Sequence, residues 1–263
     1  MAASVFKVQV ALEVESQIAR GDLDPQERCV IRSEDRTPGP TGISLFSDDA
    51  ECSLRDLVTL MLTISDNAAT DALLRRVGID TVNEGARRLG MGSTVIEADL
   101  RTTIDSIGID AGFKDYEALN TWLDCVGGGS ELDRVAGRIR RSRAMTPSSA
   151  NRTTASDMVL LMRRIWTDEA GPPGACAAVR SLMRRQLTRN RIAAAFPPPA
   201  RVSAKSGGLM GIVRNEVGVV EHHGGTFFVA IFTEAFKAWT RDAEINAAIG
   251  EVARTSVESL LSE

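Results

Sequence analysis

The chain has only two histidines among its 263 residues, and they are neighbours, His222 and His223. Both fall in an expected tight turn between two strands, where side chains are usually exposed. A Ser-His-Asp triad is therefore not indicated, because it needs a histidine beside the nucleophile. The sequence also lacks any apolar run of about 20 residues, so no membrane span is expected.

Cysteines are few and scattered, at positions 29, 52, 125 and 176, with no CxxC pair. Zinc and a disulfide framework are therefore not expected, and each cysteine is interpreted as a single buried thiol. The pattern implies neither a metal nor an organic cofactor.

The composition is that of a soluble globular protein, with 43% hydrophobic and 25% charged residues. A net charge of −4 argues against nucleic acid or an anionic membrane as the main partner. The densest basic run, 138–143, is interpreted as a solvated helix face. No signal peptide is predicted, since the candidate chemistry begins at the fourth residue, and the compartment stays open.

Apolar periodicity and capping signals predict a largely helical first part of the chain. A helix over 4–20 is apolar nearly all round and stops at Gly21, and a turn-rich stretch follows it. Ser53 is expected to cap a second helix. Further helices are expected over 67–90, 115–125, 131–142, 154–167 and 180–189, of which the first is closed by Gly90.

After Pro197-Pro198-Pro199 the pattern changes to short β-branched runs separated by glycines. Residues 201–208, 213–221 and 226–233 are predicted to form an antiparallel meander. A C-terminal amphipathic helix follows, whose buried stripe is expected to comprise Ile245, Ile249, Val252, Ser256 and Leu260.

The first candidate for chemistry is Ser4-x-x-Lys7. Residues three apart share a helix face, so the amine and the hydroxyl can approach each other. Burial in an apolar helix lowers the pKa of a lysine, which can then accept the serine proton. Taken alone, the motif is weak, and a lysine that extends from a surface helix into water is its default interpretation.

Two further motifs lie far along the chain. Ser65-Asp66-Asn67 follows an apolar helix and offers a hydroxyl and an amide, although such a turn also caps helices. Lys205-Ser206-Gly207-Gly208 ends a predicted strand, where lysine and serine can bind a carboxylate and glycine lets the backbone approach a ligand. Its alternative interpretation is an ordinary strand-terminal turn.

Together and in this order, S-x-x-K, S-D-N and K-S-G resemble the signature of class A β-lactamases and penicillin-binding proteins over nearly the whole chain. Two further features are similar to this family. Arg152-Thr153-Thr154 with Met158 resembles the helix start beyond the Ω-loop, and Arg214 falls where many members carry a carboxylate-binding arginine.

The resemblance implies a role for each matching residue. Ser4 would be the nucleophile, Lys7 its activating neighbour and Ser65 the proton relay. Asn67 would position the substrate amide. The substrate carboxylate would be held by Lys205, Ser206 and Arg214, and the backbone N–H groups of Ser4 and Gly208 would form the oxyanion hole.

Two departures from the family matter. No Glu-x-x-Leu-Asn segment, whose glutamate activates the deacylating water in class A enzymes, is found between Asn67 and Arg152. Residues 130–133 resemble this segment only weakly. Glu97, Asp99, Asp105 and Asp110 are other carboxylates that could activate the water, and the sequence does not favour any one of them. The helix and two strands that precede the S-x-x-K helix in the family also have no counterpart before Ser4. Either the start is placed late or the sheet has lost two strands, and in the second case 226–233 is expected to expose an unpaired edge.

The expected fold is therefore a mixed α/β, β-lactamase/DD-peptidase-like one, with an antiparallel sheet flanked by helices plus a helical domain. The helical part spans 1–190 and the sheet with the last helix 191–263, with the cleft between them. A β-lactamase-like hydrolase with slow deacylation is the first functional hypothesis. The alternatives are a D-alanyl-D-alanine peptidase or small-ester hydrolase, and a module that binds β-lactams or cell-wall fragments without turnover.

Overall fold

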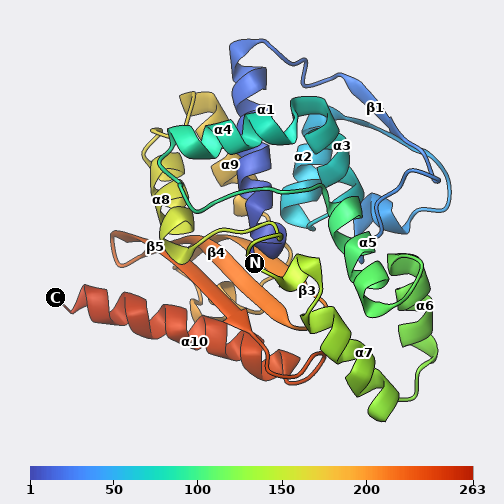
Figure 1. The fold of residues 1–263 in the computed structure, drawn as a ribbon. Coiled ribbons are helices and arrows are strands. Elements are labelled where there is room, and N and C mark those ends of the chain that lie inside the picture. The colour runs from blue at the N-terminus through green and yellow to red at the C-terminus, as the bar shows by residue number, and fades with distance from the viewer. Residues whose placement is uncertain (263) are drawn as a thin grey trace.

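A three-stranded antiparallel sheet lies behind the N-terminus of the chain (Figure 1). The computed structural model describes residues 1–262. The strands β3 (Arg201–Leu209), β4 (Val213–His222) and β5 (Gly225–Glu234) follow one another in space as in sequence. The predicted meander is confirmed, and the β4–β5 turn lies at His223, as expected.

Within residues 1–262, β5 pairs with β4 alone, so its outer edge is unpaired, as the sequence predicts. A separate two-stranded ladder joins β1 (Arg28–Ile31) to β2 (Ala50–Ser53). The sequence analysis missed this ladder, because strands of four residues are too short to show an alternating pattern. Helices flank the sheet, which confirms the predicted fold class.

The first helix carries the N-terminal motif into the centre of the molecule (Figure 1). It begins as a 3-10 turn, η1 (Ala3–Phe6), and continues as α1 (Lys7–Arg20). Gly21 ends it in the left-handed conformation at φ 80°, which glycine adopts without strain. Residues 5–14 are all buried, as expected for a helix that is apolar nearly all round.

Helices from several parts of the chain pack around α1, and three of them follow it directly in the sequence. Ser53 caps α2 (Leu54–Thr63), since its hydroxyl accepts the Asp56 N–H at 3.3 Å, as predicted. The single helix expected over 67–90 is wrong: Gly78 interrupts it at φ 84°, between α3 (Asn67–Val77) and α4 (Ile79–Arg88).

A helical lobe covers the open end of the sheet, at the right of Figure 1. It contains α5 (Leu100–Ala111), α6 (Tyr116–Cys125), α7 (Ser130–Arg140) and the 3-10 turn η3 (Arg143–Met145). The sequence predicts α6 and α7 but not α5. The lobe has its own apolar cluster, which also includes Ile212 and Val213 from the end of the sheet. The basic run 138–143 belongs to this lobe. It is not simply a solvated helix face, because Arg140 forms an ion pair with Glu234 of β5 at 2.7 Å.

The remaining helices complete the structure. Thr154 caps α8 (Ala155–Trp166) as expected, whereas the helix predicted over 180–189 is wrong: α9 spans Pro173–Met183, and a 3-10 turn, η4 (Ile192–Ala195), follows. The last helix, α10 (Asp242–Leu261), buries Ile249, Gly250, Ala253 and Val257. The expected stripe is therefore wrong at Val252, Ser256 and Leu260, which are all exposed. A further 3-10 turn, η2, spans Gly42–Leu45.

The four cysteines are free thiols, but only Cys176 is buried, and Cys125 is exposed. Cys29 and Cys52 are not isolated from each other, because they face one another across β1 and β2. Helices long and apolar enough to cross a bilayer do not occur in residues 1–262.

Candidate active site

Ser4 lies on the short turn η1 and lines a cavity of about 350 Å³. The preceding residue, Ala3, has φ 46°, a sparsely populated conformation for a residue with a side chain. Six other residues named by the sequence analysis line the same cavity: Ser65, Asn67, Ser206, Gly207, Gly208 and Arg214. Segments separated by up to two hundred residues in the chain therefore meet at one serine.

Lys7 is fully buried one helical turn beyond Ser4. Its ammonium donates to the Ser65 carbonyl at 2.6 Å and to Asn67 Oδ1 at 2.8 Å, and it lies 3.4 Å from Ser65 Oγ. Burial lowers the pKa of Lys7 to about 7, although the Asp66 and Asp71 carboxylates act in the opposite direction. Half of the Lys7 side chains are then neutral near pH 7, as a proton acceptor must be.

Within residues 1–262, no hydrogen bond joins Ser4 Oγ to Lys7 Nζ. The amine is held by Ser65 and Asn67 instead, while the Lys7 backbone N–H donates to the Ser4 carbonyl. Catalytic contacts are often long before a substrate binds and tighten in the complex. The shared helix face keeps the two side chains on the same side of η1 and α1.

Ser65 connects α2 to α3 in the left-handed conformation at φ 64°. The adjacent Asp66 caps α3, since Oδ1 accepts the Ala69 N–H at 3.1 Å, and Oδ2 accepts the Ile43 N–H at 2.7 Å. A Cβ at Gly42 would lie 2.2 Å from Asp66 Oδ2, so only glycine fits there. The helix-cap interpretation of this motif is thus right for Asp66, while Ser65 and Asn67 face the lysines.

Lys205 approaches the same hydroxyl from the sheet. Its fully buried ammonium donates to Ser65 Oγ at 2.9 Å and to the Ser206 carbonyl at 2.6 Å. Burial lowers the pKa of Lys205 well below its usual value, and the nearby Lys7 charge lowers it further. The Ser65 hydroxyl therefore bridges two amines that are both tuned toward the neutral form.

Strand β3 passes directly beside the nucleophile. A Cβ at Gly207 would lie 3.1 Å from the Ser4 backbone nitrogen, so glycine permits this approach. Arg214 faces Gly208 across β3 and β4 and pairs with Asp242 of α10. Its buried Nε has no partner within residues 1–262.

Several residues that the sequence analysis missed also line the cavity, among them Arg191 and Asn151. Arg191 is buried, and its Nη1 donates to the carbonyls of Gly207 at 2.9 Å and Asn215 at 2.6 Å. It thus ties the KSG strand to its neighbour. Arg191 lies in an irregular segment before η4, where no periodicity marks a residue as functional.

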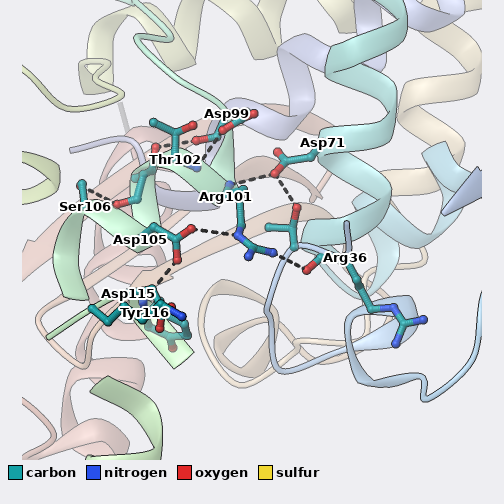
Figure 2. A network of polar contacts seen from close by, with 12 residues as sticks. Arg36, Asp71, Asp99, Arg101, Thr102, Asp105, Ser106, Asp115 and Tyr116 are labelled. Carbon is teal, nitrogen blue, oxygen red and sulfur yellow. Dashed lines mark hydrogen bonds and ion pairs between the residues drawn. The ribbon is translucent and has the colours of Figure 1, made fainter. Parts of the chain in front are cut away.

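Neither Asp nor Glu occurs among the cavity-lining residues of the described chain. The four carboxylates considered from sequence are engaged elsewhere: Glu97 pairs with Arg152, Asp99 caps α5, Asp105 binds Arg101 at 2.8 Å, and Asp110 binds Arg143 at 3.0 Å. Figure 2 shows Asp99 and Asp105 in this polar network around Arg101.

The same network includes a buried carboxylate, Asp71, that fastens the lobe to the site. Asp71 Oδ1 accepts the Leu100 N–H at 2.9 Å, and Oδ2 accepts the Arg101 N–H at 2.8 Å and the Thr37 hydroxyl at 2.7 Å (Figure 2). Burial raises the pKa of Asp71. Because Asp71 belongs to α3, it links the start of α5 to the helix that begins with Asn67.

Within residues 1–262, no group of three or more His, Cys, Asp or Glu side chains is arranged to hold a metal ion.

Known proteins are similar to this chain in sequence and in architecture. The Beta-lactamase enzyme family model matches residues 1–260. The chain is 30% identical to the beta-lactamase regulatory protein BlaB of Streptomyces cacaoi, over 96% of this chain and 83% of that protein.

Solved structures agree. The β-lactamase of Sphaerobacter thermophilus has 26% identity and a TM-score of 0.75, with 98% of this chain and 82% of that one covered. An ancestral class A β-lactamase, GNCA, of the last common ancestor of Gram-negative bacteria, has 19% identity and a TM-score of 0.74, with 98% and 85% covered. The S-x-x-K, S-D-N and K-S-G residues thus meet in a chain with the fold of class A β-lactamases, and the chain belongs to the Beta-lactamase enzyme family.

Proposed function

We propose that this chain is a serine acyl transferase of the β-lactamase type. β-Lactams acylate it at Ser4, and the acyl group is then released slowly. Ser4 Oγ attacks the lactam carbonyl, and the neutral Lys7 amine accepts its proton. The Ser65 hydroxyl then passes a proton to the leaving nitrogen. The backbone N–H groups of Ser4 and Gly208 stabilise the oxyanion.

Substrate binding is assigned to the remaining motif residues. Lys205, Ser206 and Arg214 bind the carboxylate of the substrate, and the Asn67 amide orients its side-chain amide. Gly207 lets β3 lie close enough to Ser4 for an extended substrate to run along the strand. Arg191 is a positioning residue, since it holds the Gly207 carbonyl rather than facing a reacting atom.

One observation carries the proposal: the Ser65 hydroxyl lies within 2.9 Å of Lys205 Nζ and 3.4 Å of Lys7 Nζ, at the edge of the cavity that exposes Ser4. A hydroxyl between two buried amines can move a proton in either direction at little cost. No structural requirement of the fold explains two fully buried lysines at one serine, because burying an ammonium is unfavourable.

Slow deacylation follows from the cavity lining. Hydrolysis of the acyl-enzyme requires a base that activates water, and no carboxylate lines the cavity within residues 1–262. A penicilloyl ester at Ser4 is therefore expected to persist for minutes or longer.

The lack of a carboxylate in the cavity lining of residues 1–262 also favours two alternative functions. A relative of 30% identity is named as a regulatory protein, which fits a module that is acylated without turnover. A D-alanyl-D-alanine peptidase or small-ester hydrolase would instead turn over acyl-D-Ala-D-Ala or simple esters, with β-lactams as inhibitors.

Intact-mass spectrometry after mixing with penicillin tests the proposal. The expected result is a stoichiometric adduct on the peptide that contains Ser4, which is absent from the Ser4→Ala variant. Nitrocefin and p-nitrophenyl ester assays on both proteins separate the alternatives: fast nitrocefin turnover contradicts slow deacylation, and ester turnover supports the peptidase or esterase. The absence of both an adduct and any turnover would refute acyl transfer at Ser4.

A further inference from the structure

A second cavity, of about 320 Å³, lies on the opposite flank of α1, beneath α4 and α8. Figure 1 shows α4 crossing α1 at the top of the molecule, with α8 beside them. The volume falls at the lower end of the range of roughly 300–1,000 Å³ typical of small-molecule sites. None of the active-site residues lines it.

The wall formed by α1 is polar, although the helix is buried. Gln9, Glu13 and Ser16 follow at helical spacing, each buried, and all three line the cavity. Gln9 is 5% exposed, and neither its Nε2 nor its Oε1 has a partner within residues 1–262. An amide buried without partners is costly, so its donor and its acceptor both call for a ligand that fills the cavity.

Charged groups of both signs surround this amide. Glu13 Oε1 accepts the Gln17 side-chain N–H at 2.9 Å and lies 3.6 Å from Arg20. Glu13 Oε2 has only the looser contact with Arg88 at 3.7 Å, so this oxygen retains capacity to accept hydrogen bonds. Opposite it, the Nε of Arg164 is buried without a partner in the described chain. The cavity thus offers a carboxylate and an amide oxygen next to guanidinium groups.

Glycine leaves the space open at two points of the wall. A Cβ at Gly85 would lie 3.5 Å from Glu13 Oε2, and one at Gly171 would lie 2.9 Å from Ser16 Oγ. A Cβ at Gly171 would therefore crowd the Ser16 hydroxyl, whereas one at Gly85 would make only an ordinary contact with Glu13.

We propose that this cavity is a binding site for an amino-acid-sized zwitterion, whose carboxylate contacts Arg88 and Arg164 and whose ammonium contacts Glu13 and the Gln9 amide oxygen. The Gln9 amide nitrogen donates to the same ligand carboxylate. The site is independent of the acyl-transfer chemistry at Ser4.

Isothermal titration with free alanine, serine, glutamine and arginine, each as both enantiomers, tests the proposal on the full chain. At least one is expected to bind at millimolar concentration or below. Gln9→Leu keeps the side-chain size and removes both unpartnered atoms, so it should fold and lose binding at least tenfold. Arg88→Ala should also weaken binding, whereas Arg87→Ala, on the same helix but outside the cavity, should not.

The Lys205→Met variant distinguishes binding at the second cavity from binding at the catalytic cavity. It should bind the amino acid as tightly as the parent protein does. Thermal melts confirm that each variant is folded. The proposal is overturned if none of the eight compounds binds, if Gln9→Leu binds equally well, or if Lys205→Met alone abolishes binding. A crystal structure with the best binder soaked in, showing water only in this cavity, would also overturn it.

Discussion

Lys205 Nζ lies 2.9 Å from Ser65 Oγ, so the strand proposed to bind the substrate carboxylate is joined directly to the hydroxyl proposed to relay the proton. Lys7 reaches the same residue from α1. Under the proposed mechanism, a substrate carboxylate at Lys205 changes the charge next to the Ser65 hydroxyl, so the pH dependence of acylation tests both assignments.

The maximal rate of acylation should rise with pH around neutrality. Since the pKa of Lys7 is about 7, the neutral amine that is proposed to accept the Ser4 proton becomes the main form above that pH. The neutral fraction grows roughly tenfold between about pH 6 and pH 8. Stopped-flow measurements at saturating penicillin should follow that increase. Lys7→Arg, which stays charged, should show no such rise, and a flat profile for the parent protein would contradict the role of Lys7.

The apparent affinity for the substrate should fall as pH rises. Burial and the Lys7 charge lower the pKa of Lys205, so it loses its proton, and with it the attraction for a carboxylate, at lower pH than an exposed lysine. The half-saturating penicillin concentration should therefore increase with pH. Lys205→Arg keeps its charge and should give a flatter curve. Parallel curves for the two proteins would argue against carboxylate binding by Lys205.

Hydroxylamine should release the acyl group faster than water. It is a strong neutral nucleophile, so it attacks an ester without the carboxylate base that the cavity lining lacks. We expect loss of the penicilloyl adduct to accelerate at least tenfold in neutral hydroxylamine, followed by mass spectrometry. The measurement fails to support the proposal if the adduct disappears within seconds in buffer alone.

Gly108 should be essential for the lobe that borders the site. It lies in α5, and a Cβ there would be 2.1 Å from the Asp115 carbonyl oxygen at the start of α6. Gly108→Ala is expected to lower the free energy of unfolding by about 3 kcal/mol. Gly174→Ala, in α9 with nothing within 4 Å, is the matched control and should raise it by up to about 1 kcal/mol. Urea denaturation of both variants provides the comparison.

The strands and the motifs of the site could be predicted from the sequence because each depends on neighbouring residues. β-Branched runs between glycines define β3 to β5, and Ser53 and Thr154 cap their helices as expected. Helix α5 was missed because Leu100–Ala111 mixes threonine, aspartate and glycine with its apolar residues. Helix α9 was misplaced although Pro173 at its first position is a typical start signal.

What the sequence could not predict depends on tertiary contacts. Gly250 packs against the Arg191 backbone, where a Cβ would lie 2.8 Å from the Arg191 carbonyl oxygen, so α10 buries the face that contains Gly250 and Ala253 and leaves Val252 exposed. Arg191 itself reaches the site from an irregular segment. Both contacts join parts of the chain that no local pattern relates.

The β1–β2 ladder brings two thiols together that look unrelated in the sequence. Cys29 and Cys52 face each other directly, and antiparallel partners have Cα atoms roughly 4.5–5.5 Å apart, a separation that a disulfide can span. Oxidation by diamide, which takes up the two thiol hydrogens, is therefore expected to link them. Partial burial raises the pKa of both thiols, so the reaction should accelerate at alkaline pH, where thiolates form.

A Cys125→Ser background removes the exposed thiol and prevents links between molecules. Peptide mapping should then recover a Cys29–Cys52 cross-link that is absent from Cys52→Ser. The bridge closes a loop of about two dozen residues, so it should raise the free energy of unfolding by about 3 kcal/mol in urea. Two free thiols after oxidation, under conditions in which a model dithiol is fully oxidised, would show that the ladder holds the two sulfur atoms too far apart.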